Sequence, residues 1–360
     1  MALAAAGLRR ATPLAATGLF LGANAPDVDV FSGFVAYYES LAFRRGWTHG
    51  VLALALWPFV LTGVLLLWDR YVRLKRKPDA APARAGPLLA LTAIAVVSHP
   101  TLDWLNNYGL RWLMPFSGEW FYGDALFVID PWVWLVLGGV AFLTFSQSRL
   151  ARVRWAVFSV LASVLIFANT ELVPTASVLL WLGGLAAFVA VRWWLRDAPP
   201  VMLERAAQAG MAVTAVYMVT MVAASAVARS DVRVAAAAQG IVAEDVMVAP
   251  VPADPFRGQV IVMTPDEYYT GRFDWLAEPR LRLDAESIPR PRGTAFELAS
   301  QDAAARRFLV WSRYPVIELT PDRGAIRVTF TDVRYRGQNQ NRLEGPKVFL
   351  PASAVESGGN

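Results

Sequence analysis

The 360-residue chain has no cysteine and only two histidines. The absence of cysteine excludes disulfide bonds and thiolate metal ligands. The sequence contains neither a Gly-rich phosphate loop nor a solenoid-type repeat. Charge is also sparse, since 18% of the residues are charged and 56% are hydrophobic, with a mean hydropathy of +0.38. A soluble domain of this length would need a more polar surface, so the composition predicts a protein integrated in a membrane.

Apolar runs approaching the roughly 20 residues of a membrane crossing recur through residues 1–228. A weaker run, Ala11–Leu21, resembles a secretion signal, but Pro26 disfavours cleavage after it. We expect this run to be a retained membrane helix or a partial insertion. The fold class predicted is therefore an α-helical polytopic membrane protein with six or seven transmembrane helices. The longer runs are Val51–Trp68, Leu88–Trp104, Trp132–Phe145 (expected to extend into its neighbours), Val153–Asn169, Ser177–Trp194 and Ala206–Val227.

Residues 229–360 differ in character, being more charged and rich in proline and glycine. We predict a β-rich extramembrane domain there, because short alternating or β-branched stretches are separated by turn signals. The expected strands lie in Asp245–Val251, Gly258–Met263, Phe308–Tyr314 and Ala325–Tyr335.

Basic residues are concentrated in every second loop between the apolar runs, beginning with the loop that holds Arg70–Arg84. The positive-inside rule places these loops in the cytoplasm, and the β-rich domain then lies on the opposite face. This pattern accounts for the net charge of +5 without a nucleic-acid partner. The expected environment is the lipid bilayer.

Both histidines lie in short polar clusters that the same topology brings towards the outer face. His49 closes Arg44-Arg45-Gly46-Trp47-Thr48-His49, and His99 precedes Asp103 by four residues. Ionisable side chains in a membrane are costly and indicate function. Imidazole and carboxylate together are an ordinary ligand set for zinc or a similar divalent ion. On a continuous helix His99 and Asp103 share one face, unless Pro100 starts or bends the helix at that point.

Further carboxylates complete the predicted site. In an extended stretch Asp27 and Asp29 would point the same way and reach one ion. The aromatic loop Tyr108–Trp134 offers Asp124 or Asp130 as additional ligands and Glu119 as a base.

Two side chains of the His49 cluster have expected supporting roles. Thr48 is a hydrogen-bond partner for His49. Arg45 is suited to hold an anion or to stabilise developing negative charge.

Each cluster also has a plain structural interpretation. His99 can pair with Asp103 alone and join two helices, and Pro26-Asp27-Val28-Asp29 has the composition of a solvated turn. Arg44, Arg45 and Trp47 are suitable interfacial anchors.

Taken together, Pro26-Asp27-Val28-Asp29, Arg45-Gly46-Trp47-Thr48-His49 and Ser98-His99 with Asp103 resemble the YdjM-type family of bacterial inner-membrane proteins. The motif resemblance covers about residues 1–150, and the remainder matches a long form with an appended outer domain. It implies a metal-dependent hydrolase of the inner membrane, distantly similar to zinc-dependent phospholipase C and related zinc nucleases. Members commonly begin with a Thr-His or Gly-His element and carry histidine before the Arg-Gly pair, whereas this chain begins Met1-Ala2-Leu3 and has Arg44.

The sequence therefore predicts a membrane-embedded metal-dependent hydrolase acting on a phosphoester of lipid or envelope origin, in the bacterial inner membrane with a periplasmic C-terminal domain. Zinc is the expected ion, held by Asp27, Asp29, His49, His99 and Asp103. The alternatives are a non-catalytic envelope protein whose outer domain binds a partner, and an ion-coupled transporter that uses His and Asp as a relay.

Overall fold

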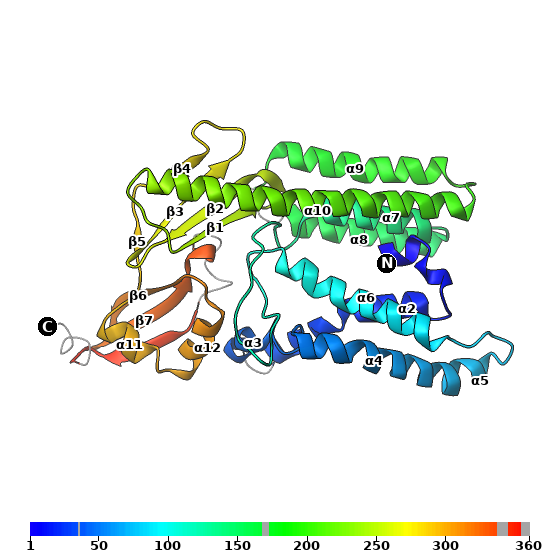
Figure 1. Cartoon of the computed structure of the whole chain (residues 1–360), viewed down its shortest axis with the longest axis horizontal. Helices are drawn as coiled ribbons and strands as arrows, with labels where there is room; N and C mark the ends of the chain where they lie inside the picture. Colours follow the sequence, from blue (N-terminus) through cyan, green and yellow to red (C-terminus); the bar gives the residue numbers. More distant parts are fainter. Residues whose placement is uncertain (35–36, 168–172, 337–344, 354–360) are drawn as a thin grey trace. The chain divides into compact units, whose positions relative to one another are not determined.

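The computed structural model describes residues 1–34, 37–167, 173–336 and 345–353 (Figure 1). The chain divides into two compact units, described separately below. We call them the membrane unit and the β-rich unit. The membrane unit comprises Met1–Asp27, Arg45–Val227 and Ala249–Gly258, and the β-rich unit comprises Val28–Arg44, Ala228–Val248 and Gln259–Asn360.

Five helices within the described residues are long and apolar enough to cross a membrane. The prediction of a multi-pass helical membrane protein is confirmed, although this number is below the six or seven crossings expected. In the first, α4 (Val51–Trp68) continues through a π-helical turn, Asp69–Arg73, into α5 (Leu74–Arg76). The others are α6 (Ala85–Trp104), α8 (Arg149–Phe167), α9 (Thr175–Trp194) and α10 (Pro200–Ala237).

The remaining apolar segments form shorter helices. The expected extension of the Trp132–Phe145 run is wrong, because α7 (Pro131–Phe145) has 15 residues. Its first turn is fixed by Asp130, whose carboxylate accepts hydrogen bonds from the amides of Trp132 and Val133. At the N-terminus, α1 (Ala2–Ala5) and a 3-10 turn (Leu8–Arg10) precede α2 (Ala15–Asn24), whose 10 residues fall short of a crossing.

Helix α2 packs closely on α6 and α4, and this packing positions the polar clusters. A Cβ at Gly22 would lie 2.8 Å from the Cβ of Ala95, so the two backbones approach as only a glycine permits. Between α4 and α6, the hydroxyls of Thr62 and Thr92 are 3.0 Å apart and hydrogen-bonded. The C-terminal ends of α2 and α6 thereby meet the segment that enters α4.

Helices α7, α8, α9 and α10 run alongside one another in the second half of the membrane unit (Figure 1). The Tyr217 hydroxyl on α10 donates to the Asp130 carboxylate at the start of α7, over 2.9 Å. Indole Nε1 of Trp181 on α9 donates to the Ser163 hydroxyl on α8 over 2.9 Å. These bonds satisfy polar groups in otherwise apolar surroundings.

Two antiparallel sheets confirm the prediction of a β-rich C-terminal part. One has the strand order β1-β2-β3-β4 with β5 paired to β3, and the other has the order β6-β7-β8. The register of the second sheet aligns Pro315 with Asp332 and Asp322 with Ala325. The strands are β1 (Asp245–Val251), β2 (Asp254–Met263), β3 (Glu267–Asp274), β4 (Leu281–Leu283), β5 (Ile288–Pro289), β6 (Pro315–Asp322), β7 (Ala325–Asp332) and β8 (Lys347–Pro351).

One expected strand is wrong. Most of Phe308–Tyr314 belongs to α12 (Ala303–Trp311), which follows the short α11 (Thr294–Ala299). Asp302 caps α12 by accepting from the amides of the two residues after Ala303. The buried side chains Ala305, Phe308 and Trp311 recur every three residues along one helical face. The β-rich unit also contains α3 (Tyr37–Phe43).

Candidate metal centre

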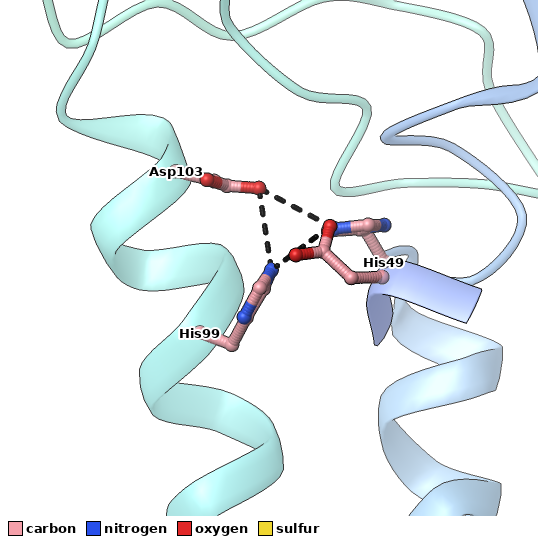
Figure 2. A group of neighbouring side chains, drawn as sticks. His49, His99 and Asp103 are labelled. Carbon is pink, nitrogen blue, oxygen red and sulfur yellow. Dashed lines mark ion pairs between the residues drawn. The ribbon is translucent and has the colours of Figure 1, made fainter. Parts of the chain in front are cut away.

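Four side chains of the membrane unit meet at the end of α6. Asp27, His49, His99 and Asp103 each offer a ligand atom, and these atoms all lie within 4.8 Å of one another. Figure 2 shows His99 and Asp103 side by side on α6, with His49 facing them from the segment that precedes α4. Residues separated by 76 positions therefore form one polar group in an apolar unit.

His99 is oriented by the end of α2. Its Nδ1 lies 2.7 Å from the carbonyl oxygen of Ala23, and a carbonyl can only accept, so Nδ1 carries the proton. Nε2 then faces the group. Helix α6 continues through Pro100, which keeps His99 and Asp103 one helical turn apart. Of the two alternatives considered at Pro100, a helix start is therefore excluded.

His49 is fully buried in a tight turn. Its amide donates to the Gly46 carbonyl over 3.1 Å, and a Cβ at Gly46 would collide with the guanidinium of Arg111. The predicted partner is confirmed, since the Thr48 hydroxyl lies 2.9 Å from His49 Nδ1. The amide of Val51 donates to the carbonyl of Trp112 and anchors this turn to the loop after α6.

The two carboxylate oxygens of Asp103 face different neighbours. Arg45 Nη2 donates to Oδ1 over 3.0 Å, while Oδ2 lies 3.3 Å from His49 Nε2 and 3.5 Å from His99 Nε2. Arg45 Nη1 donates to the amide oxygen of Asn106 over 3.0 Å.

The guanidinium of Arg45 also lies 4.5 Å from the ring centroid of Tyr108. Arg45 thus holds the Asp103 carboxylate in place, and its expected role towards a substrate anion stays a prediction.

Asp27 and Asp29 have different surroundings. Oδ1 of Asp27 lies 3.5 Å from His99 Nε2 and 3.9 Å from His49 Nε2, and its side chain is 48% exposed. Asp29 belongs to the β-rich unit, where Oδ1 lies 3.7 Å from Arg44 Nε. The extended geometry expected here is wrong, because Pro26–Phe34 forms 3-10 turns. At three residues per turn, positions i and i+2 point in different directions.

The other residues proposed from sequence lie outside this group of four. Glu119 is exposed on the loop after α6. Asp124 is buried, and its backbone carbonyl accepts from the Ser225 hydroxyl over 2.9 Å. Both carboxylate oxygens of Asp130 are already engaged, by the start of α7 and by Tyr217.

Sequence reasoning missed several supporting contacts. The Ala23 carbonyl and the Gly109 carbonyl, which accepts from Arg45 over 3.4 Å, are backbone groups and have no sequence signal. Asn106 did have a sequence signal. It lies three residues after Asp103 and can therefore reach the same side of a helix end.

Comparison with known proteins shows a similarity over the part of the chain that holds this group. The chain is 27% identical to the uncharacterized protein YfhP of Bacillus subtilis (strain 168) over 114 residues, which is 32% of each chain. It thus spans about a third of that relative's length. No solved structure matches it. The family model described as YdjM inner membrane protein matches residues 1–173, which contain all four clustered side chains. Over residues 1–173 the chain is therefore similar to the YdjM inner membrane protein family.

Proposed function

We propose that the protein is a membrane-embedded metal-dependent hydrolase in which Asp27, His49, His99 and Asp103 surround a divalent ion, with zinc as the expected ion. The observation that carries this proposal is the convergence of the four ligand atoms within 4.8 Å. The expected substrate is a phosphoester of lipid or envelope origin.

The spacing of the donor atoms fits an ion better than a direct network of ion pairs. Zinc at about 2.1 Å from each ligand in a tetrahedron would hold neighbouring donors about 3.4 Å apart. The four nitrogen–oxygen separations across the group are 3.3, 3.5, 3.5 and 3.9 Å. Direct charge-assisted hydrogen bonds would close to about 2.7–2.9 Å.

Two buried atoms support the same conclusion. His99 Nε2 and Asp103 Oδ2 face each other at 3.5 Å, yet within the described part of the chain neither makes a hydrogen bond. Leaving a buried polar atom unsatisfied costs about 1–3 kcal/mol. A cation between them satisfies both at once. The carbonyl that fixes the His99 tautomer is the type of supporting contact that metal-binding histidines make.

Differences in exposure suggest separate roles. Catalytic zinc sites have three protein ligands and one open position. His49, His99 and Asp103 are the more buried members, and Asp27 is the exposed one. We infer that His49, His99 and Asp103 would hold the ion and that Asp27, beside them, would accept the proton of an attacking water. When bound, the ion would supply Lewis acidity towards that water and towards a phosphoryl oxygen.

Substitution of Asp27 tests the hydrolase proposal. In mild detergent we expect about one divalent ion per chain, and slow hydrolysis of bis(p-nitrophenyl) phosphate that a chelator abolishes. Because a general base contributes roughly 10²–10⁴-fold, Asp27→Asn should lower kcat by that factor and retain most of the ion. Metal analysis and kinetics on the same preparation measure both quantities.

Asp197→Asn is the matched control, because this carboxylate is 88% exposed in the loop before α10. Glu119→Gln compares the other proposed base directly, and a larger loss there than in Asp27→Asn would refute the role of Asp27. A purified protein with no stoichiometric divalent ion would refute the hydrolase proposal altogether. It would favour a helix-joining role or an ion relay.

Arg45 is a positioning residue in this proposal. We expect Arg45→Gln to weaken zinc affinity about 10- to 100-fold, because supporting partners of metal ligands contribute on that order. Titration against a zinc-binding dye measures the change, and the melting temperature of the metal-free protein reports any general damage. Arg44→Gln is the control, since Arg44 lies beside Asp29, whereas Arg45 pairs with Asp103. Equal affinities in both variants would contradict the role.

The orientation of the site belongs to the same proposal. The positive-inside pattern predicts that the ends of α2 and α6 that carry it face the periplasm, together with the β-rich unit. A phosphoester in the outer leaflet or the periplasm would then reach Asp27 without crossing the membrane.

A further inference from the structure

A cavity of about 370 Å³ lies among α7, α8 and α9 in the membrane unit. This volume is within the range of pockets that hold small ligands. It is separate from the group around His99, because no residue of that group lines it. At 1.5 Å per residue, the lining positions extend over about 12 Å on α7 (Trp134 to Phe142) and about 15 Å on α8 (Arg152 to Ala162). The cavity is therefore elongated along the helices.

The cavity wall is aromatic and almost wholly apolar. Trp134 stacks with Phe158 at 6.1 Å between ring centroids, and Phe142 meets Trp155 edge-on at 6.1 Å. Trp181 also lines it, but its indole N–H is engaged by Ser163. An apolar chain thus fits this wall, and a polar ligand does not.

Two adjacent glycines on α7 differ in the space beside them, and only Gly138 faces open volume. A Cβ at Gly139 would collide with the ring of Phe188, so this glycine is required for helix packing. A Cβ at Gly138 would meet nothing within 4 Å, and Gly138 lines the cavity. A larger side chain at Gly138 can therefore occupy the space without displacing a neighbour.

A positively charged side chain lies at one end of the apolar cavity. Arg152, in the first turn of α8, is the charged residue among those that line it. It is exposed, and the segment 146–154 contains three arginines and no acidic residue. A guanidinium suits bidentate recognition of a phosphate. Apolar length and a terminal cation are together complementary to a lipid with an anionic headgroup.

We propose that this cavity binds one acyl chain of an anionic phospholipid, whose phosphate pairs with Arg152. The site is independent of the proposed metal centre. A lipid chain bound there would contact α7, α8 and α9 and would fill the space beside Gly138.

Native mass spectrometry of the full chain in mild detergent tests this proposal, with phosphatidylglycerol and phosphatidylcholine of identical chains as probes. We expect phosphatidylglycerol to bind at least about fivefold more tightly, since one basic residue near anionic lipid contributes on that order. Arg152→Gln should remove this preference, and Gly138→Leu should reduce the binding of both lipids.

Each variant has a matched control. Arg149→Gln changes an exposed arginine one turn earlier, and Gly183→Leu fills open space on α9 at a position that does not line the cavity. Equal affinity for both lipids, or equal effects of the variants and their controls, would show only the general lipid layer and overturn the proposal. If Gly138→Leu does not fold, the comparison of Arg152→Gln with Arg149→Gln still tests the proposal, because the Arg152 side chain is exposed.

Discussion

Replacing His99 with alanine is expected to abolish stoichiometric metal binding. The substitution removes a buried donor atom that lies 3.5 Å from both Asp27 and Asp103. It also frees the Ala23 carbonyl, which orients the ring. Because supporting partners alone contribute about 10- to 100-fold to affinity, loss of a ligand should cost more than about 100-fold. Elemental analysis after purification, followed by titration with zinc, measures the loss.

The control must separate loss of a ligand from damage to α6. Thr101→Ala changes an exposed side chain two residues away, whose hydroxyl donates to the carbonyl of Val97. It should leave the metal content unchanged. Asp29→Asn is informative in a different way, because Asp29 was predicted as a ligand but lies beside Arg44. Retention of an equimolar ion in His99→Ala would refute the metal centre, whatever the activity.

The second large effect is expected in the β-rich unit, at the end of β7. Asp332 is buried, and its carboxylate accepts from Arg334, from the Ser312 hydroxyl and from the amides of Arg313 and Tyr314. Asp332→Ala leaves the equally buried Arg334 without its charge partner. Breaking one side of a buried pair costs about 3–5 kcal/mol. We expect the β6–β8 sheet to lose hydrogen-exchange protection in the intact protein.

A double substitution distinguishes this cause from a simple packing defect. In Asp332→Leu with Arg334→Met no unpaired charge remains, so part of the lost stability should return. Asp322→Ala is the control on the neighbouring β6, since its ion pair with Arg327 is long, at 3.9 Å, and partly exposed. Unchanged exchange in Asp332→Ala would contradict the prediction.

The same carboxylate gives a pH dependence of defined sign. Burial alone would raise the pKa of Asp332, but Arg334 and the surrounding donors lower it below its ordinary value. A lowered folded-state pKa adds stability that is complete above the unfolded pKa of about 3.9. That stability disappears as the pH falls through the folded value. Exchange protection in β7 should therefore fall below about pH 4 in the natural protein, and this decline should be absent in the Leu/Met double variant.

The candidate metal group was largely predictable because ionisable residues are scarce in an apolar sequence. His49, His99, Asp103 and Asp27 stand out against long hydrophobic runs, and charge topology brings them to one face. The prediction that Asp29 is a metal ligand depended on an extended local backbone. An alternating Asp-Val-Asp-Val stretch suggests extended geometry, whereas the chain forms 3-10 turns there. Sequence periodicity over four residues does not distinguish the two conformations.

Tertiary contacts account for the other differences. Arg45 has the chemistry of an anion-binding residue, but the loop after α6 brings Asn106 and Tyr108 against it and commits it to Asp103. Phe308–Tyr314 has strand-like composition, but the Asp302 cap and the alanines after it favour a helix. Neither outcome follows from the spacing of residue types alone.

The position of the four donors along the chain has a consequence for biosynthesis. All of them, with the arginine that orients Asp103 and the groups that hold that arginine, fall between residues 23 and 109. Helices α7 to α10 and the β-rich unit are translated later. The four candidate ligands are therefore translated before these elements, so the proposed ion could bind while the remaining membrane helices are still being inserted.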